Sequence, residues 1–111
     1  VKELAAYLQS YIIVKGAWTT IVTPEGNFYF NSTGNPGMAT GGSGDVLTGI
    51  LLGLLTQGYT REEACRLGVY IHGLAGDIAA EAKTEIGMTA HDIVEALPVA
   101  WKKITSISPK I

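Results

Sequence analysis

Asn31-Ser-Thr-Gly-Asn-Pro-Gly-Met-Ala-Thr-Gly-Gly-Ser-Gly-Asp45 runs directly into Val46-Leu-Thr-Gly-Ile-Leu-Leu-Gly-Leu-Leu55. The first part carries five glycines, which allow a backbone to turn tightly and to approach another molecule closely. The second part has apolar residues at helical spacing. Ser43 can cap the start of this helix, and Gly58 can close its end. The sequence therefore predicts a glycine-rich loop that leads into the first turn of a buried helix.

Such a helix start is a candidate anion site. Its first backbone N–H groups have no partner within the helix, and the helix dipole favours an anion beside them. Asp45 is unexpected here, because a carboxylate repels a phosphate. A carboxylate at this position therefore needs a functional reason, and the removal of a proton from an incoming hydroxyl group is such a reason. The alternative is that Asp45 only complements the dipole and that the glycines serve tight packing. The combination of glycines, helix start and carboxylate favours the anion site.

Composition restricts the class of protein. The chain has 111 residues, enough for one domain at most. A hydrophobic fraction of 47% and a charged fraction of 16% exclude a disordered chain. A net charge of -2 argues against a nucleic-acid partner, and the helix from Val46 is too short to span a membrane. The single cysteine, Cys65, cannot form an internal disulfide, which fits the cytoplasmic location that we expect.

The sequence before the loop predicts a short helix and three strands. Residues 3–8 are helix-like, and residues 11–14 form an apolar run typical of a strand buried on both faces. Residues 19–23 and 28–30 are β-branched or aromatic, and residues 24–27 between them have turn chemistry. These two strands are expected to form a hairpin.

The sequence after the loop predicts two more helices. A capping box at Thr60 opens the first, which runs to about Lys83. His72 lies on this helix without a second histidine at ligand spacing, so we expect a helix-face or core residue and not a metal ligand. The second helix opens near Thr89, and Pro98 should kink or interrupt it.

These elements form an incomplete α/β layer. Three strands cannot bury the apolar helix from Val46 and also cover their own edges. Further parallel strands in a missing N-terminal half would solve both problems, so we expect residues 1–111 to be a single partial domain.

The glycine-rich loop closely resembles the signature of the ADP- or ATP-dependent NAD(P)H-hydrate dehydratases, repair enzymes of the ribokinase-like superfamily. Residues 14–19, Val-Lys-Gly-Ala-Trp-Thr, are similar to the Lys-Gly-Ala-X-Thr segment of this family. Residues 23–26 resemble its hairpin turn, and residues 87–92 resemble the start of its last helix. The resemblance implies the C-terminal portion of a ribokinase-like three-layer α/β fold, with few strands, a hairpin and about three major helices.

The resemblance also implies a reaction, in which hydrated NADH or NADPH (NADHX or NADPHX) is dehydrated at the cost of ADP or ATP cleavage. Asp45 would be the catalytic base that meets the hydroxyl of the hydrate, and Asn35 a further substrate contact. The N–H groups of residues 42–44 would stabilise charge on the transferred phosphoryl group. Mg²⁺ would accompany the nucleotide, although no residue is assigned as its ligand. The residues that would bind the nucleotide are Lys15, Gly16, Ala17, Trp18, Thr19, Gly42, Ser43 and Gly44.

Two other functions stay open. A small-molecule kinase of the same superfamily, acting on a vitamin precursor or a sugar, would use the same loop and stop at the phosphoryl ester. A non-catalytic nucleotide-binding module would bind without turnover. The run from Asn35 to Gly42 favours the dehydratase. We expect a homo-oligomer, and we expect the isolated 111 residues to self-associate through the exposed sheet edge and the apolar helix. The choice between ADP and ATP and the presence of a fused epimerase domain are left open.

Overall fold

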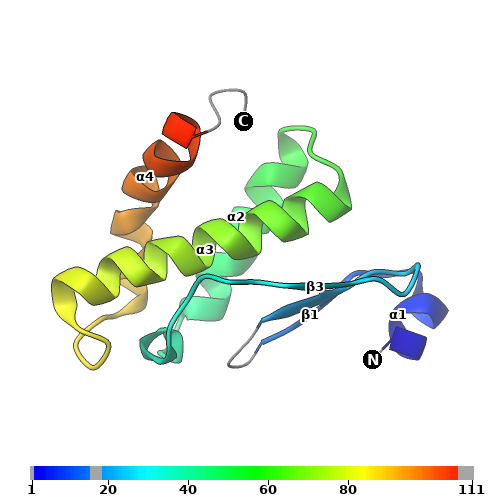
Figure 1. Ribbon diagram of the computed structural model, residues 1–111, viewed down its shortest axis with the longest axis horizontal. Helices are drawn as coiled ribbons and strands as arrows, with labels where there is room; N and C mark the ends of the chain where they lie inside the picture. The colour runs from blue at the N-terminus through cyan, green and yellow to red at the C-terminus, as the bar shows by residue number, and fades with distance from the viewer. Residues whose placement is uncertain (1, 16–18, 108–111) are drawn as a thin grey trace.

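The structure is a computed structural model that describes residues 2–15 and 19–107. In Figure 1 the three long helices form one layer, and the strands extend from it as a thin sheet toward the N-terminal helix. The predicted α/β class, with a hairpin and three major helices, is confirmed. The elements are α1 (Lys2–Leu8), β1 (Ile12–Val14), β2 (Thr20–Val22), β3 (Phe28–Phe30), the 3-10 helix η1 (Pro36–Met38), α2 (Ser43–Thr56), α3 (Arg61–Lys83) and α4 (Ala90–Ile107).

The sheet has the order β1-β2-β3, and both strand pairs are antiparallel. Ile13, Ile21 and Tyr29 lie side by side across the three strands. They pack with Leu47 of α2 and Val69 of α3 in a small hydrophobic cluster. The alternation of side chains along a strand therefore fixes which face of the sheet meets the helices.

Cys65 of α3 packs against the same cluster beneath the sheet and is half-buried. Burial raises the pKa of its thiol above the ordinary value, because a low-polarity surrounding disfavours the thiolate. The thiol is free, as the sequence predicted for a lone cysteine.

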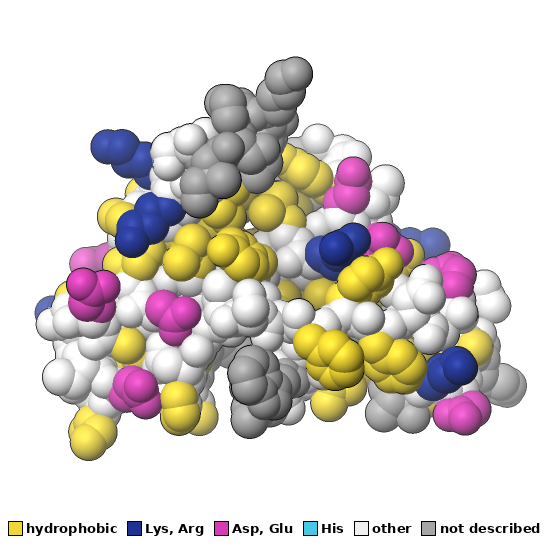
Figure 2. All heavy atoms as spheres, viewed as in Figure 1, with side chains coloured by type: hydrophobic (Ala, Val, Ile, Leu, Met, Phe, Trp, Pro, Cys, Tyr) yellow, Lys and Arg dark blue, Asp and Glu magenta, His cyan; other side chains and the backbone are white. Residues whose placement is uncertain are grey.

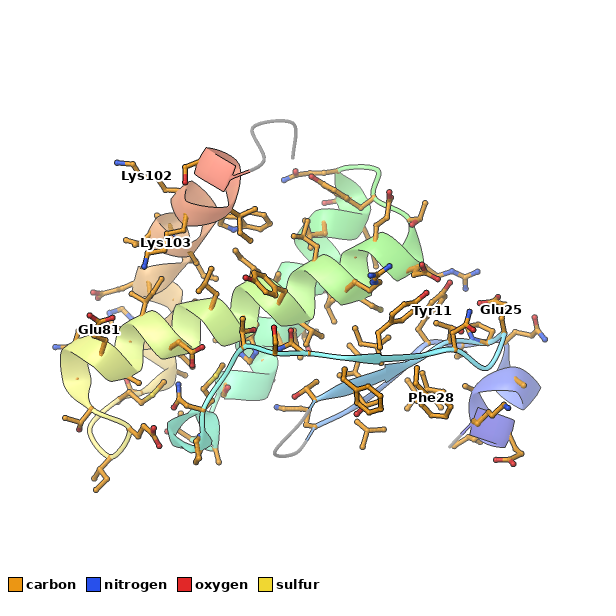
Figure 3. All side chains as sticks on the ribbon, in the orientation of Figure 1. Tyr11, Glu25, Phe28, Glu81, Lys102 and Lys103 are labelled. Carbon is orange, nitrogen blue, oxygen red and sulfur yellow. The ribbon has the colours of Figure 1, made fainter. Side chains whose placement is uncertain are left out.

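The other face of the sheet is open at Val14, Phe28 and Phe30, whereas Val22 on the same face is buried. Val14 is 41% exposed and Phe30 is 72% exposed. Figure 3 shows Phe28 on this side, opposite Tyr11, which lies on the side of the helices. The prediction that residues 11–14 are buried on both faces is therefore wrong for the described chain. β1 is an edge strand here, and no described helix covers its outer face at Val14.

The main core lies between α3 and α4. Its buried residues are Ile71, Ala75, Ala79, Met88, Ile93, Ala96, Ala100 and Ile104. The predicted capping box is present: Glu63 N–H donates to Thr60 Oγ1 at 3.1 Å, and Thr60 N–H donates to Glu63 Oε1 at 2.9 Å. α4 continues through Pro98, so the expected interruption does not occur. Packing of the α4 face that carries Ile93 and Ile104 holds the helix together across the missing backbone donor.

Helix α2 is less buried than its sequence predicts. Its buried residues are Ser43, Leu47 and Leu54, whereas Leu52 is 58% exposed and Leu55 is 40% exposed. Within the described residues α3 and α4 pack on one side of α2 and leave its other side open. Figure 2 shows apolar side chains on the molecular surface over the helices and the sheet. No helix in residues 2–15 and 19–107 is both long enough and apolar enough to cross a membrane.

The end of α2 agrees with the prediction. Gly58 has a positive φ of 94°, and Tyr59 N–H donates to Leu54 O at 3.2 Å while Gly58 N–H donates to Leu55 O at 3.2 Å. This pair of hydrogen bonds is the Schellman arrangement that closes many helices at glycine.

Candidate functional site

The glycine-rich loop is attached to α3 by side-chain hydrogen bonds. Thr33 Oγ1 donates to Tyr70 O at 2.9 Å. Gly34 N–H donates to Asp77 Oδ2 at 3.0 Å, and Asn35 Nδ2 donates to Asp77 Oδ1 at 2.9 Å. Both oxygens of one carboxylate thus hold two consecutive loop residues. The loop lies on α3 in a defined position before it reaches α2.

Two glycines of α3 make this close approach possible. A Cβ at Gly73 would lie 2.7 Å from the carbonyl carbon of Thr33. A Cβ at Gly76 would lie 2.6 Å from Cε of Met38. Because such contacts are shorter than real Cβ atoms tolerate, a larger residue at position 73 would lift the loop backbone away from α3, and one at position 76 would displace the Met38 side chain.

The loop ends at Gly42, which is the N-cap of α2 and has a positive φ of 91°. The prediction that Ser43 caps this helix is wrong, because Ser43 is the first helical residue and its side chain faces α3. Ser43 N–H donates to Thr40 O at 3.2 Å and is not available to an anion. The N–H groups of Gly42 and Gly44 have no hydrogen-bond acceptor among the described residues. These two groups remain the candidates for anion binding.

His72 of α3 contacts Ser43 beneath this first turn. Its Nε2 lies 3.0 Å from Ser43 O and 3.3 Å from Ser43 Oγ. His72 is 6% exposed and Ser43 is 2% exposed. Burial lowers the pKa of the imidazole below 6.5, and the positive charge of Lys15 lowers it further. The hydrogen bond to Ser43 acts in the opposite direction and raises this pKa. The expectation of a core or helix-face histidine is confirmed.

A cavity of about 700 Å³ lies between the strand ends, the loop and α3. Four predicted site residues line it: Lys15, Thr19, Asn35 and Ser43. Among the described lining residues Lys15 carries the sole formal charge. Its Nζ lies 3.4 Å from where a Cβ on Gly44 would be, so the ammonium group is next to the start of α2. Lys15 therefore lines the cavity and also places a positive charge beside Gly44, which itself lies just outside the cavity lining.

The other predicted residues have different positions. Asp45 is exposed in the first turn of α2, one residue beyond Gly44. The Oδ1 atom of Asn35 accepts from Gly37 N–H at 3.0 Å, so with its bond to Asp77 the Asn35 side chain stabilises the loop. Its contact with substrate stays a prediction. The predicted nucleotide contacts Gly16, Ala17 and Trp18 lie outside the described residues.

Among the other lining residues are four to which sequence reasoning assigned no binding role: Asn31, Thr33, His72 and Gly73. The first two lie within the quoted glycine-rich loop, which is a usable signal. His72 is a polar residue between apolar neighbours on the packed face of α3, and this pattern alone did not identify its partner. Contacts across 29 residues, such as Ser43 with His72, have no local sequence signature.

The cavity fits a phosphorylated ligand better than it fits a bare metal ion. A phosphate group requires a cation and N–H donors, and Lys15 with Gly42 and Gly44 supplies both. Within residues 2–15 and 19–107 there is no group of three or more His, Cys, Asp or Glu side chains that could hold a metal. Mg²⁺ commonly binds through phosphate oxygens and one or two carboxylates, so it would be held here mainly by the nucleotide.

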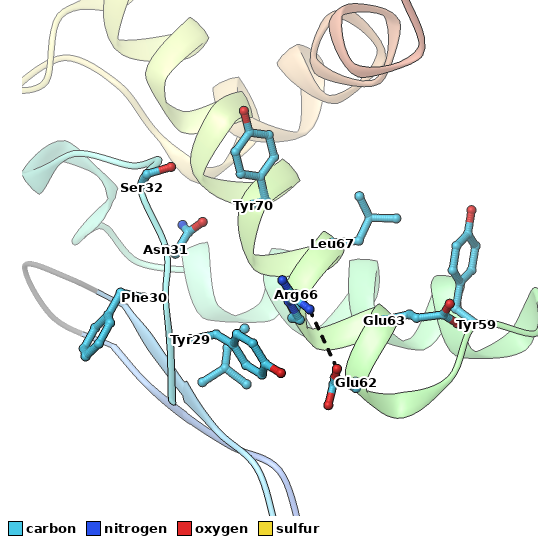
Figure 4. A pocket seen from close by; sticks show the side chains of 11 residues that line it. Tyr29, Phe30, Asn31, Ser32, Tyr59, Glu62, Glu63, Arg66, Leu67 and Tyr70 are labelled. Carbon is cyan, nitrogen blue, oxygen red and sulfur yellow. Dashed lines mark ion pairs between the residues drawn. The ribbon is translucent and has the colours of Figure 1, made fainter. Parts of the chain in front are cut away.

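A second hollow of about 570 Å³ lies on the other side of β3, against α3 (Figure 4). Its lining includes Tyr29, Tyr70 and Arg66, and none of the predicted site residues. Arg66 Cζ lies 4.1 Å from the centre of the Tyr29 ring, and Arg66 Nη1 lies 3.7 Å from Glu62 Oε2. Arg66 and Glu62 thus engage each other, and the carboxylate of Glu63, which also lines the hollow, accepts from Thr60 N–H.

Comparison with known proteins gives a consistent result. The family model of NAD(P)H-hydrate dehydratase matches residues 1–99. The bifunctional NAD(P)H-hydrate repair enzyme Nnr of Thermofilum pendens is 51% identical over 92% of this chain and 20% of its own. The ADP-dependent (S)-NAD(P)H-hydrate dehydratase of Bacillus subtilis is 38% identical over 92% of this chain and 37% of its own. The chain thus spans between one fifth and two fifths of these relatives.

A solved structure agrees with this result. The ADP/ATP-dependent NAD(P)H-hydrate dehydratase from Bacillus subtilis, co-crystallised with ATP/Mg²⁺, superposes with a TM-score of 0.86 at 38% identity. The match covers 92% of this chain and 37% of that structure.

Proposed function

The chain belongs to the NAD(P)H-hydrate dehydratase family, and we propose that the intact protein restores hydrated NADH and NADPH by nucleotide-dependent dehydration. Residues 1–111 would be the C-terminal part of its catalytic domain, and the remaining part would complete the substrate pocket. The similarity of this chain to roughly two fifths of the Bacillus subtilis enzyme supports this assignment.

One observation carries the proposal. Lys15, which follows β1, lies beside Gly44 at the N-terminus of α2, and Asp45 is the next residue. A cation and unpaired N–H groups attract phosphate at this point, whereas the carboxylate does not. A carboxylate placed there is explained if it removes a proton while a phosphoryl group is transferred.

The proposed chemistry has two stages. Asp45 accepts the proton of the hydrate hydroxyl as the hydroxyl oxygen attacks the terminal phosphorus of the nucleotide. Lys15 and the N–H groups of Gly42 and Gly44 stabilise the charge that grows on the phosphoryl oxygens. The nucleotide leaves shortened by one phosphate, as AMP from ADP or as ADP from ATP. Phosphate then leaves with the former hydroxyl oxygen while a proton is lost from the neighbouring ring carbon, and the double bond of the nicotinamide ring is restored. Hydroxide alone is a poor leaving group, which is why phosphorylation comes first.

The proposed nucleotide is ADP or ATP, with Mg²⁺ neutralising its phosphates. Lys15, Thr19, Ser43 and Gly44 would contact the nucleotide, together with Gly16, Ala17 and Trp18. The Bacillus subtilis relatives support both nucleotides, since one is named ADP-dependent and another was crystallised with ATP/Mg²⁺. We further propose that the protein is cytoplasmic and that it forms a homo-oligomer.

A repair assay on the intact protein tests this function. Hydrated NADH is supplied with ADP and separately with ATP, and recovery of NADH absorbance is followed together with phosphate release. Recovery with either nucleotide supports the dehydratase and identifies the phosphoryl donor. Binding of nucleotide without recovery would contradict it, and a stable phosphorylated product from a vitamin precursor or a sugar would identify a kinase instead.

A further inference from the structure

We propose that His72 is a positioning residue, whose ring N–H fixes the first turn of α2 and thereby orients Gly44 and Asp45 toward the reacting groups. The inference rests on the proposed function and adds to it a residue to which no role had been assigned. The contact joins α2 to α3 through Ser43 and His72, which are 29 positions apart in the sequence.

The contact is directional. A carbonyl oxygen only accepts hydrogen bonds, so the Nε2 atom that lies 3.0 Å from Ser43 O must carry a proton. The same N–H is near Ser43 Oγ, at 3.3 Å. In the neutral ring Nδ1 is then unprotonated. His72 therefore has one defined tautomer, and its single N–H points at the first residue of α2.

The two partners are rigidly held. His72 and Ser43 are both almost fully buried, and His72 lies next to Gly73, against which the loop packs. Ser43 is joined to the loop by its own N–H, which donates to Thr40 O. The imidazole thus connects α3 to the junction between loop and helix from below. Movement of this junction would carry Gly44 and Asp45 with it, because they are the next two residues.

The neutral ring also suits its position. The positive charge of Lys15 acts on His72, and the ammonium group of Lys15 lies beside Gly44. A second positive charge beneath the site would repel Lys15, whereas a neutral N–H donor holds the helix without this cost. The arrangement leaves the charge of Lys15 for the ligand.

A purely structural histidine is the competing explanation, and kinetics separates the two. Leucine at position 72 keeps the apolar volume and removes the N–H, whereas glutamine can return an N–H donor to a similar place. Ile93→Val removes a methyl group from the core of α4, away from the cavity, and serves as the matched control. All variants are made in the intact protein and checked by urea unfolding.

We expect His72→Leu to lower kcat for hydrate repair by about 10- to 100-fold, since small displacements of reacting groups have effects of this size. The Kd for ADP should change by less than about fivefold, because ground-state binding needs less exact geometry. His72→Gln should recover kcat to within about threefold of wild type. Ile93→Val should keep kcat within about twofold although its unfolding midpoint falls.

Three results would overturn the inference. The first is wild-type kcat in His72→Leu, and the second is a folded His72→Gln protein no better than His72→Leu. The third does not depend on activity: a ¹⁵N–¹H spectrum of the wild-type imidazole that shows a neutral ring protonated on Nδ1. If wild type itself repairs no hydrate with either nucleotide, the proposed function fails, and the tautomer measurement still decides whether His72 donates to Ser43.

Discussion

The hydroxyl oxygen of Thr33 occupies the space that a methyl group on Gly73 would need. The two residues are 40 positions apart, and Thr33 is held there by its hydrogen bond to Tyr70 O. The lack of a side chain at one position of α3 therefore sets the height at which the glycine-rich loop crosses that helix.

Gly73→Ala should displace the loop and destabilise the protein by about 1–3 kcal/mol, as overpacking usually does. ADP affinity should fall with it, because Gly73 and Thr33 both line the cavity. Urea unfolding and calorimetric titration measure the two effects. Gly53→Ala is the matched control, since a Cβ there meets nothing within 4 Å and alanine favours a helix. Equal stability of the two variants would refute the packing argument.

Asp45→Asn should lower turnover by a factor of about 10² or more, with ADP binding largely kept, because the amide cannot accept the hydroxyl proton. Asp45 is exposed, so the fold should be unaffected. The comparison variant is Asp92→Asn, which changes an acidic residue in the first turn of α4 whose carboxylate accepts from Thr89 N–H. Steady-state assays that find the two variants equally active would remove Asp45 as the base.

Lys15→Gln should weaken ADP binding about tenfold, the size of one charge-assisted hydrogen bond to a phosphate. The loss should shrink as salt is raised, because ions screen the ammonium group in wild type. Lys102→Gln is the control: Lys102 is an exposed residue near the C-terminal end of α4 (Figure 3). Titrations at two ionic strengths would exclude Lys15 from the site if both variants bind like wild type.

The pH dependence of stability should contain a contribution from His72. Its pKa is below 6.5 in the folded protein because the ring is buried, so the unfolded chain takes up the proton first as the pH falls. The free energy of unfolding is then highest above pH 6.5, decreases as the pH falls toward the folded-state pKa, and levels off below it. Urea unfolding of wild type and His72→Gln between pH 5 and pH 8 isolates this term. Parallel curves would show that burial does not shift this histidine.

Local sequence signals predicted most of the elements and few of the contacts between them. The capping box at Thr60 and the turn at Gly58 depend on residues three to five apart, so the sequence contains them completely. The burial of β1 was overestimated because an apolar run does not reveal whether a second layer covers it. The same limit applies to α2, where Leu52 is apolar and 58% exposed.

In the candidate site, too, the sequence predicted the local features and missed the contacts between distant residues. The glycine-rich loop and Lys15 could be identified by resemblance, and the structure brings Lys15 next to Gly44. The anchoring of the loop by Asp77 and of α2 by His72 could not be identified. Both contacts come from α3 and join residues that are 29 to 43 positions apart, so no local sequence pattern reveals them. Ser43 was expected to serve as a cap, but its buried partner on α3 takes its side chain instead.

The labelling rate of the Cys65 thiol depends on how often the sheet separates from α3. This half-buried thiol lies between α3 and the sheet, and its raised pKa keeps the thiolate scarce at neutral pH. We expect labelling to become faster when the sheet lifts from α3, a partial opening that leaves the α3–α4 core intact. Because Lys15 directly follows β1 and the start of α2 belongs to the helical layer, a nucleotide that bridges them would hold the two parts closed. The labelling rate of a single cysteine would then report ligand occupancy in real time, without any added probe in the cavity.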